Sequence, residues 1–216
     1  MDEKKKEEVP KDVPKKDKKR IQVFFGYIFG MNLKDIPKEN ILGYYELKGD
    51  GGPGTIEGTK FKGKIVSLKP IEPNKEFDDY YASFTPTTEE LFNLKGEKIY
   101  KSERFPKDAA GNTVGGLPEC EKKISIIANI LRVKYKFAWE IEEENDFDVL
   151  FGDFGQIITL RSTSNDIILR CKAETNSSDN SSQIRMYINV YDNLLFSQAS
   201  GEQGTIQNKS LDSSGF

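Results

Sequence analysis

The stretch that decides the fold is LPECEKKISIIANILRVKYK, residues 117–136. Pro118 suits the first turn of a helix, where its missing N–H group costs nothing. Acidic residues lie near the start of the stretch and basic residues near its end, which matches the direction of the helix dipole. We therefore predict one long helix over residues 118–136, in a chain whose other apolar stretches have the pattern of strands.

The predicted helix has two apolar surfaces. With one residue at about every 100°, the broader face carries Cys120, Ile124, Ile127, Ala128, Leu131 and Tyr135. We expect this face to lie on a sheet. A second flank consists of Ile126, Ile130 and Val133. Either a loop of the same chain covers this flank, or the flank is an interface for a partner protein or for a second copy of the chain.

The chain has two cysteines, one in this helix and one in a predicted strand. Cys120 lies on the broad apolar face of the helix, and alternation places Cys171 on the same strand face as Ile167 and Leu169. If the helix covers that strand face, both thiols enter one core, and we predict a disulfide between Cys120 and Cys171. Closing a loop of roughly fifty residues would stabilise the fold by about 3–4 kcal/mol. The alternative is a pair of buried free cysteines in a cytosolic protein.

Composition narrows the function. The chain has 216 residues, 31% of them charged, and a net charge of −3, which argues against nucleic acid as a partner. It contains no histidine, so the commonest general base and metal ligand is missing. We expect no catalytic residues and no cofactor, and we favour a non-enzymatic protein. The chain lacks a run of about 18 apolar residues, the length that a transmembrane helix needs.

The two ends of the chain differ from its middle. Residues 1–20, MDEKKKEEVPKDVPKKDKKR, are highly charged and contain no aromatic residue. Such a segment does not bury enough apolar surface to fold, so we interpret it as a disordered linker or as a tether to a membrane anchor upstream. We expect residues 21–199 to form one domain. Residues 200–216 are rich in Gly, Ser and Gln, and we expect a flexible tail.

The remaining pattern predicts an α+β fold, a mostly antiparallel sheet with one main helix packed on it. Residues 21–30 are the first expected strand, and Asn32 caps a short helix over residues 33–40, which Pro37 interrupts. A hairpin turns at Lys95-Gly96-Glu97. The strands are expected at residues 44–48, 62–69, 77–85, 91–94, 98–101, 137–143, 156–162, 166–173 and 183–191, and a short helix at 192–198. This order also allows two helix-plus-four-strand halves, residues 21–105 and 117–199.

The best candidate for a metal site is an acidic region over residues 140–153. Calcium prefers six to eight oxygen ligands from a bent loop, and we select Asp146, Asp148 and Asp153 as its ligands. The twelve-residue spacing of an EF-hand is absent. Glu140, Glu142 and Glu144 alternate along a predicted strand, which is typical of a solvent-facing side.

Four short features, taken together, resemble small exported bacterial domains of uncharacterised function, many of them lipoproteins. They are FGYIFG at residues 25–30, Thr85-Pro86 at a strand end, Cys120 at the start of a helix that ends at Lys134-Tyr135, and Cys171 in a strand. The resemblance implies a periplasmic or cell-surface location and a binding or structural role. The chain shows neither a signal sequence nor a lipid-bearing cysteine, so the mode of anchoring stays open.

Two functions from different classes therefore follow, and a cytosolic ligand-binding domain with free thiols is a third option, which the redox state of Cys120 and Cys171 distinguishes. The first is an exported or cell-envelope interaction or structural protein. The second is a carbohydrate-active or calcium-dependent binding protein that uses residues 140–153. The two classes differ in whether the carboxylates of that region converge in a concave pocket or spread over a strand face.

Overall fold

A computed structural model of the chain describes residues 20–45, 64–101, 117–136, 139–148, 153–175 and 182–213. Its centre is an eight-stranded antiparallel sheet in the described part of the chain, with the order β3-β4-β5-β6-β10-β9-β8-β7. The strands are β3 (Ile41–Tyr45), β4 (Lys64–Leu68), β5 (Asp79–Phe84), β6 (Leu91–Lys101), β7 (Glu140–Asp148), β8 (Asp153–Arg161), β9 (Asn165–Thr175) and β10 (Ser182–Asp192).

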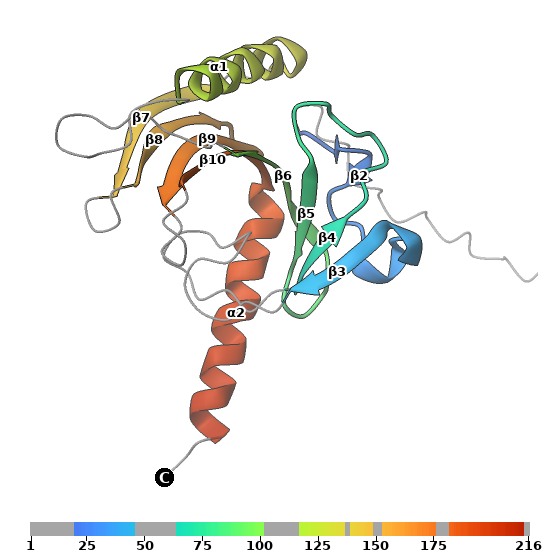
Figure 1. Cartoon of the computed structure of the whole chain (residues 1–216). Helices are drawn as coiled ribbons and strands as arrows, with labels where there is room; N and C mark the ends of the chain where they lie inside the picture. The colour runs from blue at the N-terminus through green and yellow to red at the C-terminus, as the bar shows by residue number, and fades with distance from the viewer. Residues whose placement is uncertain are drawn as a thin grey trace, which may run out of the picture.

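The sheet joins two meanders of four consecutive strands along β6 and β10. It bends strongly, with helix α1 (Leu117–Lys134) on the outer side of the bend and helix α2 (Asn193–Ser213) starting on the inner side (Figure 1). This arrangement confirms the predicted α+β class. The first meander follows two short 3₁₀ turns, whereas the second follows an 18-residue helix. The pseudo-repeat of residues 21–105 and 117–199 stays a prediction.

The predicted first strand, residues 21–30, is wrong; these residues form a small hairpin. Strand β1 (Val23–Phe24) pairs with β2 (Tyr27–Ile28). Phe25 and Gly26 between them have φ values of 51° and 83°, which reverse the chain within two residues. Asn32 then caps the following turn as predicted, because its Oδ1 accepts a hydrogen bond from the Lys34 N–H. The predicted helix over 33–40 splits at Pro37 into the 3₁₀ turns Leu33–Asp35 and Lys38–Asn40.

The predicted hairpin across Lys95-Gly96-Glu97 is also wrong, because β6 runs through it without a turn. Both neighbouring strands pair with this segment: Gly96 lies opposite Tyr80 of β5 and Ile188 of β10. A Cβ atom at residue 96 would lie 2.9 Å from the Phe77 ring and 3.0 Å from the Phe25 ring. The glycine therefore makes room for two aromatic rings.

The core is one cluster that includes residues of the 21–36 segment and of β4, β5 and β6, as well as the layer between α1 and β8, β9 and β10. Cys120, Ile124, Ala128 and Leu131 of α1 are buried, as are Ile158, Leu160, Ile167, Leu169 and Cys171 beneath them. Ile127 and Tyr135 are partly buried. The predicted broad face of the helix is therefore the face that meets the sheet.

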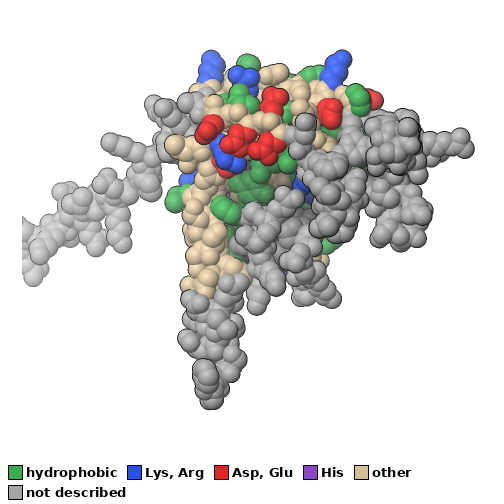
Figure 2. Space-filling model, turned by 90° about the vertical axis from the view of Figure 1, so that its left-hand side faces the viewer, with side chains coloured by type: hydrophobic (Ala, Val, Ile, Leu, Met, Phe, Trp, Pro, Cys, Tyr) green, Lys and Arg blue, Asp and Glu red, His purple; other side chains and the backbone are tan. Residues whose placement is uncertain are grey.

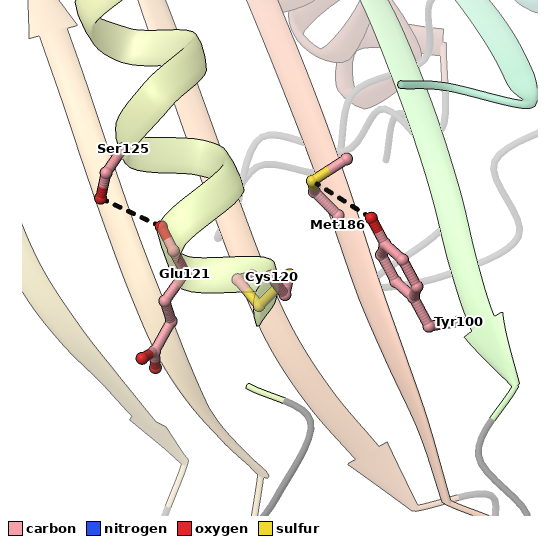
Figure 3. The surroundings of a disulfide bond; sticks show 6 residues. Tyr100, Cys120, Glu121, Ser125 and Met186 are labelled. Carbon is pink, nitrogen blue, oxygen red and sulfur yellow. Dashed lines mark hydrogen bonds between the residues drawn. A yellow bond between two sulfur atoms is a disulfide. The ribbon is translucent and has the colours of Figure 1, made fainter. Parts of the chain in front are cut away.

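The predicted disulfide is confirmed. Cys120 and Cys171 are bonded, with their Cα atoms 5.9 Å apart and a separation of 51 positions in the sequence. Figure 3 shows Cys120 in the first turn of α1, close to Tyr100 of β6 and Met186 of β10. The Tyr100 hydroxyl lies 3.9 Å from the Met186 sulfur. The bond therefore fixes the start of α1 at the middle of the sheet.

The short helix predicted over residues 192–198 and the loose tail after it are wrong: α2 continues to Ser213. Asp192 caps the helix by accepting a hydrogen bond from the Leu195 N–H at 3.1 Å, and it also pairs with Arg20. The Ser197, Ser200 and Thr205 hydroxyls donate to the carbonyl four residues before them. Serine and threonine often favour turns, but here their hydroxyl groups bond to the helix backbone, so the helix continues through them.

Glu202 holds α2 against the turn between β5 and β6. Its carboxylate accepts hydrogen bonds from the Thr87 and Thr88 N–H groups at 2.7 and 3.3 Å and from the Thr88 hydroxyl at 2.9 Å. Burial raises the pKa of Glu202, but these hydrogen bonds and one from Gln198 outweigh it, and the net pKa lies below the ordinary value of 4.5. The charged form is therefore the one that the folded state favours.

We predict that removing the disulfide by Cys120→Ala with Cys171→Ala lowers the free energy of unfolding by about 3–4 kcal/mol, because the unfolded chain regains the entropy of the closed loop. Urea denaturation measures this loss, and the natural chain treated with dithiothreitol should show the same loss. Two thiols that react with an alkylating agent in the native, unreduced protein would contradict the bond.

We predict that Glu202→Gln lowers the free energy of unfolding at pH 7 by about 1–2 kcal/mol, since a charged acceptor is lost. Because the folded pKa is lowered, the stabilisation is complete above pH 4.5 and is lost as the pH falls through the folded value. The difference between variant and parent should therefore shrink in acid. Glu39→Gln, at an exposed position, is the control, and an equal loss in both variants would refute the role of Glu202.

Candidate functional site

The structure places two hollows on opposite sides of the sheet. The first, which we call the α1 groove, separates α1 from the β1 strand and the segment 72–76, and has a volume of about 790 Å³. The second, the inner-face cavity, lies under β7 to β10 beside the start of α2, and has a volume of about 300 Å³. Both fall within or near the size range of ligand sites, about 300–1,000 Å³.

Two residues of the second apolar flank, Ile126 and Ile130, form part of one wall of the α1 groove, and Val133 continues the flank outside the groove. Ile126, Ile130 and Val133 are 49%, 58% and 74% exposed. In the described part of the chain, no other element covers this flank. Val23, which is 44% exposed, continues the apolar surface on the opposite wall. The structure thus leaves the predicted interface residues accessible, and their role as an interface stays a prediction.

The opposite wall is held in place by backbone hydrogen bonds. The Phe25 carbonyl accepts from the N–H groups of Ile71 and Glu72 at 3.2 and 3.1 Å. The Tyr80 hydroxyl accepts from the Asn74 N–H at 2.9 Å and donates to the Asn74 carbonyl at 2.8 Å. Burial raises the pKa of Tyr80, so this hydroxyl stays a donor at neutral pH. The segment 72–76 is therefore a fixed wall.

An ion pair joins the two walls. Lys123 of α1 donates to Glu76 at 3.0 Å, and its ammonium group lies 5.7 Å from the centre of the Tyr100 ring. The hydrogen bond between them lowers the pKa of Glu76 and raises the pKa of Lys123. Both groups are therefore charged at neutral pH, and the groove is closed at this end by a charged pair.

The lining of the α1 groove carries three lysines and two glutamates. Lys75, Lys123 and Lys134 are lining residues, and so are Glu72 and Glu76. Lys134 also lies 5.2 Å from the Tyr135 ring centre. Glu76 is engaged by Lys123, whereas Glu72 is exposed. The groove is an apolar strip with a small excess of positive charge.

The inner-face cavity is built by strand alternation. In β9, Ile167, Leu169 and Cys171 face α1, so Asp166, Ile168 and Arg170 face the other side. Three rows of side chains cross the strands there by register: Tyr191–Asp166–Arg161, Asn189–Ile168–Thr159–Glu142, and Tyr187–Arg170–Ile157–Glu144. Asn193 and Phe196 at the start of α2 form the side wall.

Several of these polar groups are already paired. Arg161 contacts Glu142 at 3.1 Å, Asn193 donates to Asp166 at 3.1 Å, and Arg170 donates to the Tyr187 hydroxyl at 2.9 Å. Asn189 differs: it is 8% exposed, and its Oδ1 has no hydrogen-bond partner among the described residues. Several polar side chains of the cavity are thus held by hydrogen bonds or ion pairs, whereas the Asn189 Oδ1 is an acceptor without a partner among the described residues.

Two residues of the acidic region predicted from the sequence, Glu142 and Glu144, lie at the rim of this cavity. Figure 2 looks toward the β7 side, where acidic side chains gather above a recessed apolar patch. Glu142 and Glu144 line the cavity. They were expected on a solvent face, and alternation does place them together, but that face meets the hollow of the bend. The strand prediction for this region is correct, and the curvature was missed.

The calcium prediction stays untested. Asp148 lies opposite Asp153, and Asp146 opposite Gly155, in the β7–β8 hairpin. The side chains of Asp146, Asp148 and Asp153 lie outside what the structure describes. Among the described side chains, no three acidic, cysteine or histidine groups come together as metal ligands.

The residues that sequence analysis missed are those in the middle of the inner face: Arg161, Arg170, Tyr187 and Asn189. A signal was present, because in β9 and β10 polar side chains recur at every second position between apolar ones. The predicted strands 166–173 and 183–191 contain these polar positions, but no site is predicted there from the sequence.

No helix in the described part of the chain is both long and apolar enough to cross a membrane.

No protein-family model, curated protein or solved structure matches this chain.

Proposed function

We propose that the protein is a non-enzymatic interaction protein that binds an apolar segment of a partner protein, flanked by acidic residues, in the α1 groove. The observation that carries this proposal is the exposure of Ile126, Ile130 and Val133 on a helix whose other face is buried. Exposed apolar side chains that lie together beside a groove are typical of protein-binding surfaces.

The groove is well suited to a helix or an extended peptide. The apolar residues of α1 recur at spacings of four and three along one line, so they offer a continuous strip to a partner's apolar face. The disulfide and the core hold α1 on the sheet, and hydrogen bonds hold the opposite wall. A preformed groove binds with little loss of conformational entropy.

The charge of the groove favours a partner with acidic residues. The lysines that line the groove outnumber its glutamates. Two copies that met through parallel α1 helices would bring Arg132 and Lys134 of each chain together, which is costly, whereas antiparallel helices would bring them near Glu119 and Glu121 of the other copy. A partner with Asp or Glu next to its apolar anchors complements the groove, and sedimentation velocity separates it from an antiparallel pair of copies.

The disulfide supports a compartment outside the cytoplasm. Disulfides persist in secreted, periplasmic and cell-surface proteins and are rare in reducing compartments. We propose a periplasmic or cell-surface location, with residues 1–20 as the link to an anchor, and a cytoplasmic location as the alternative. Alkylation of the protein in cells before lysis tests this point, because blocked thiols at Cys120 and Cys171 would place it in a reducing compartment.

The binding prediction rests on one substitution with a matched control. Peptides selected by phage display against the full chain should carry apolar residues at helical spacing next to Asp or Glu. Ile130→Glu should weaken their binding by roughly thirtyfold, the effect of losing a central apolar anchor. Leu194→Glu replaces a side chain that is 68% exposed on α2, and it should leave binding unchanged. Fluorescence anisotropy measures both.

Two results would contradict the proposal. One is equal binding of the selected peptides to the parent chain and to Ile130→Glu. The other is a dimer in sedimentation velocity that Ile130→Glu dissociates, because this would assign the flank to a second copy. Binding to a groove with a small excess of positive charge should also weaken as salt is added, through a slower association rate.

A further inference from the structure

We propose that the inner-face cavity binds a small neutral polyhydroxy molecule, of the size and chemistry of a mono- or disaccharide. This site lies on the side of the sheet opposite α1 and shares no lining residue with the α1 groove. The proposal is therefore independent of the function proposed above. It uses Glu142 and Glu144 of the acidic region, together with residues of β8, β9 and β10.

The side-chain amide of Asn189 has an acceptor atom without a hydrogen-bond partner in the described part of the chain. Asn189 is more than nine-tenths buried and lines the cavity, and its Oδ1 has no donor among the described residues. A buried acceptor without a donor costs about 1–3 kcal/mol. A ligand hydroxyl group in the cavity would remove that cost once the Asn189 amide turns toward the cavity, because its Oδ1 has less than 1 Å² of accessible surface in the present conformation.

The positive and negative charges that line the cavity nearly balance. Three carboxylates and two guanidinium groups line the cavity. Glu142 is paired with Arg161, and Asp166 accepts a hydrogen bond from Asn193. No large excess of either sign is left to attract an ion. A neutral ligand with both donors and acceptors matches this lining better than a phosphate or an organic cation.

The cavity lining combines apolar and polar surfaces. Ile157 and Ile168 form an apolar floor between the polar rows, and the Tyr191 and Phe196 rings, with centroids 6.0 Å apart, stand at the α2 end. A sugar ring has apolar C–H faces and a circumference of hydroxyl groups. It can lay a face on this floor while its hydroxyl groups reach Asn189, Thr159 and the rim carboxylates. The volume of about 300 Å³ admits one or two sugar rings.

The test uses the full chain and a defined panel: D-glucose, D-galactose, N-acetyl-D-glucosamine and maltose, with D-glucuronate as the anionic comparison. Isothermal titration calorimetry and saturation-transfer NMR should detect at least one neutral sugar with a dissociation constant of about 1 mM or lower. Ile168→Trp should abolish this binding by filling the floor. Ile130→Glu, in the α1 groove, should leave it unchanged.

Asn189→Leu separates a ligand-binding role from a structural one. If the amide serves a ligand, the variant should lose affinity by about tenfold while its thermal stability holds or rises, because an unsatisfied buried acceptor is removed. A fall in thermal stability with unchanged sugar affinity would overturn the assignment of Asn189. Absence of binding by every neutral sugar, binding of glucuronate alone, or a crystal soaked in sugar that shows only water at Asn189 would overturn the proposal.

Discussion

The bond between Cys120 and Cys171 fixes the position of α1, and the rest of the structure depends on that position. It ties the first turn of the helix to the middle of β9, so that Ile124, Ala128 and Leu131 pack on the sheet. Since α1 is 18 residues long and one face is committed to the core, its other flank points away from the sheet. The α1 groove exists because the helix is held in this register. A rotation of the helix by one residue would bury Ile126 or Ile130 and expose the core face.

The sheet separates two kinds of surface. Its outer side is apolar and carries the buried core, and the groove beside α1 continues this apolar character to the surface. Its inner side is polar, with a lysine and a glutamate buried in β6: Lys95 lies 2.6 Å from Glu97, which also pairs with Arg185 at 2.8 Å. Burial, followed by the Glu97 charge, raises the pKa of the nearby Tyr81 to about 12. This inner side combines buried charged and polar side chains with the apolar Ile157 and Ile168, and so differs from the usual apolar filling of a bent sheet.

The local sequence pattern predicted the helices and strands that depend mainly on interactions between residues close in the sequence. The helix dipole and the apolar period located α1, and alternation located β8, β9 and β10 and paired the two cysteines. The errors arose where distant contacts decide the structure. Gly96 resembles a turn residue, but the rings of Phe25 and Phe77 require its missing side chain. The Ser- and Gly-rich segment after Ser200 continues helix α2, in which Glu202 binds Thr87 and Thr88, more than a hundred residues away. The inner-face cavity was missed because the bend that makes it comes from the whole sheet.

The central claim is that the flank of α1 formed by Ile126, Ile130 and Val133 is open in the free protein. Methyl NMR of the full chain, with isoleucine δ1 labels and a soluble gadolinium chelate, tests it directly. The account predicts that the Ile126 and Ile130 methyl signals broaden as strongly as that of Ile71, which is 55% exposed. The signal of Ile124, which is fully buried, should stay sharp. Ile126 and Ile130 signals as protected as that of Ile124 would show that the chain covers its own flank, and would contradict the account.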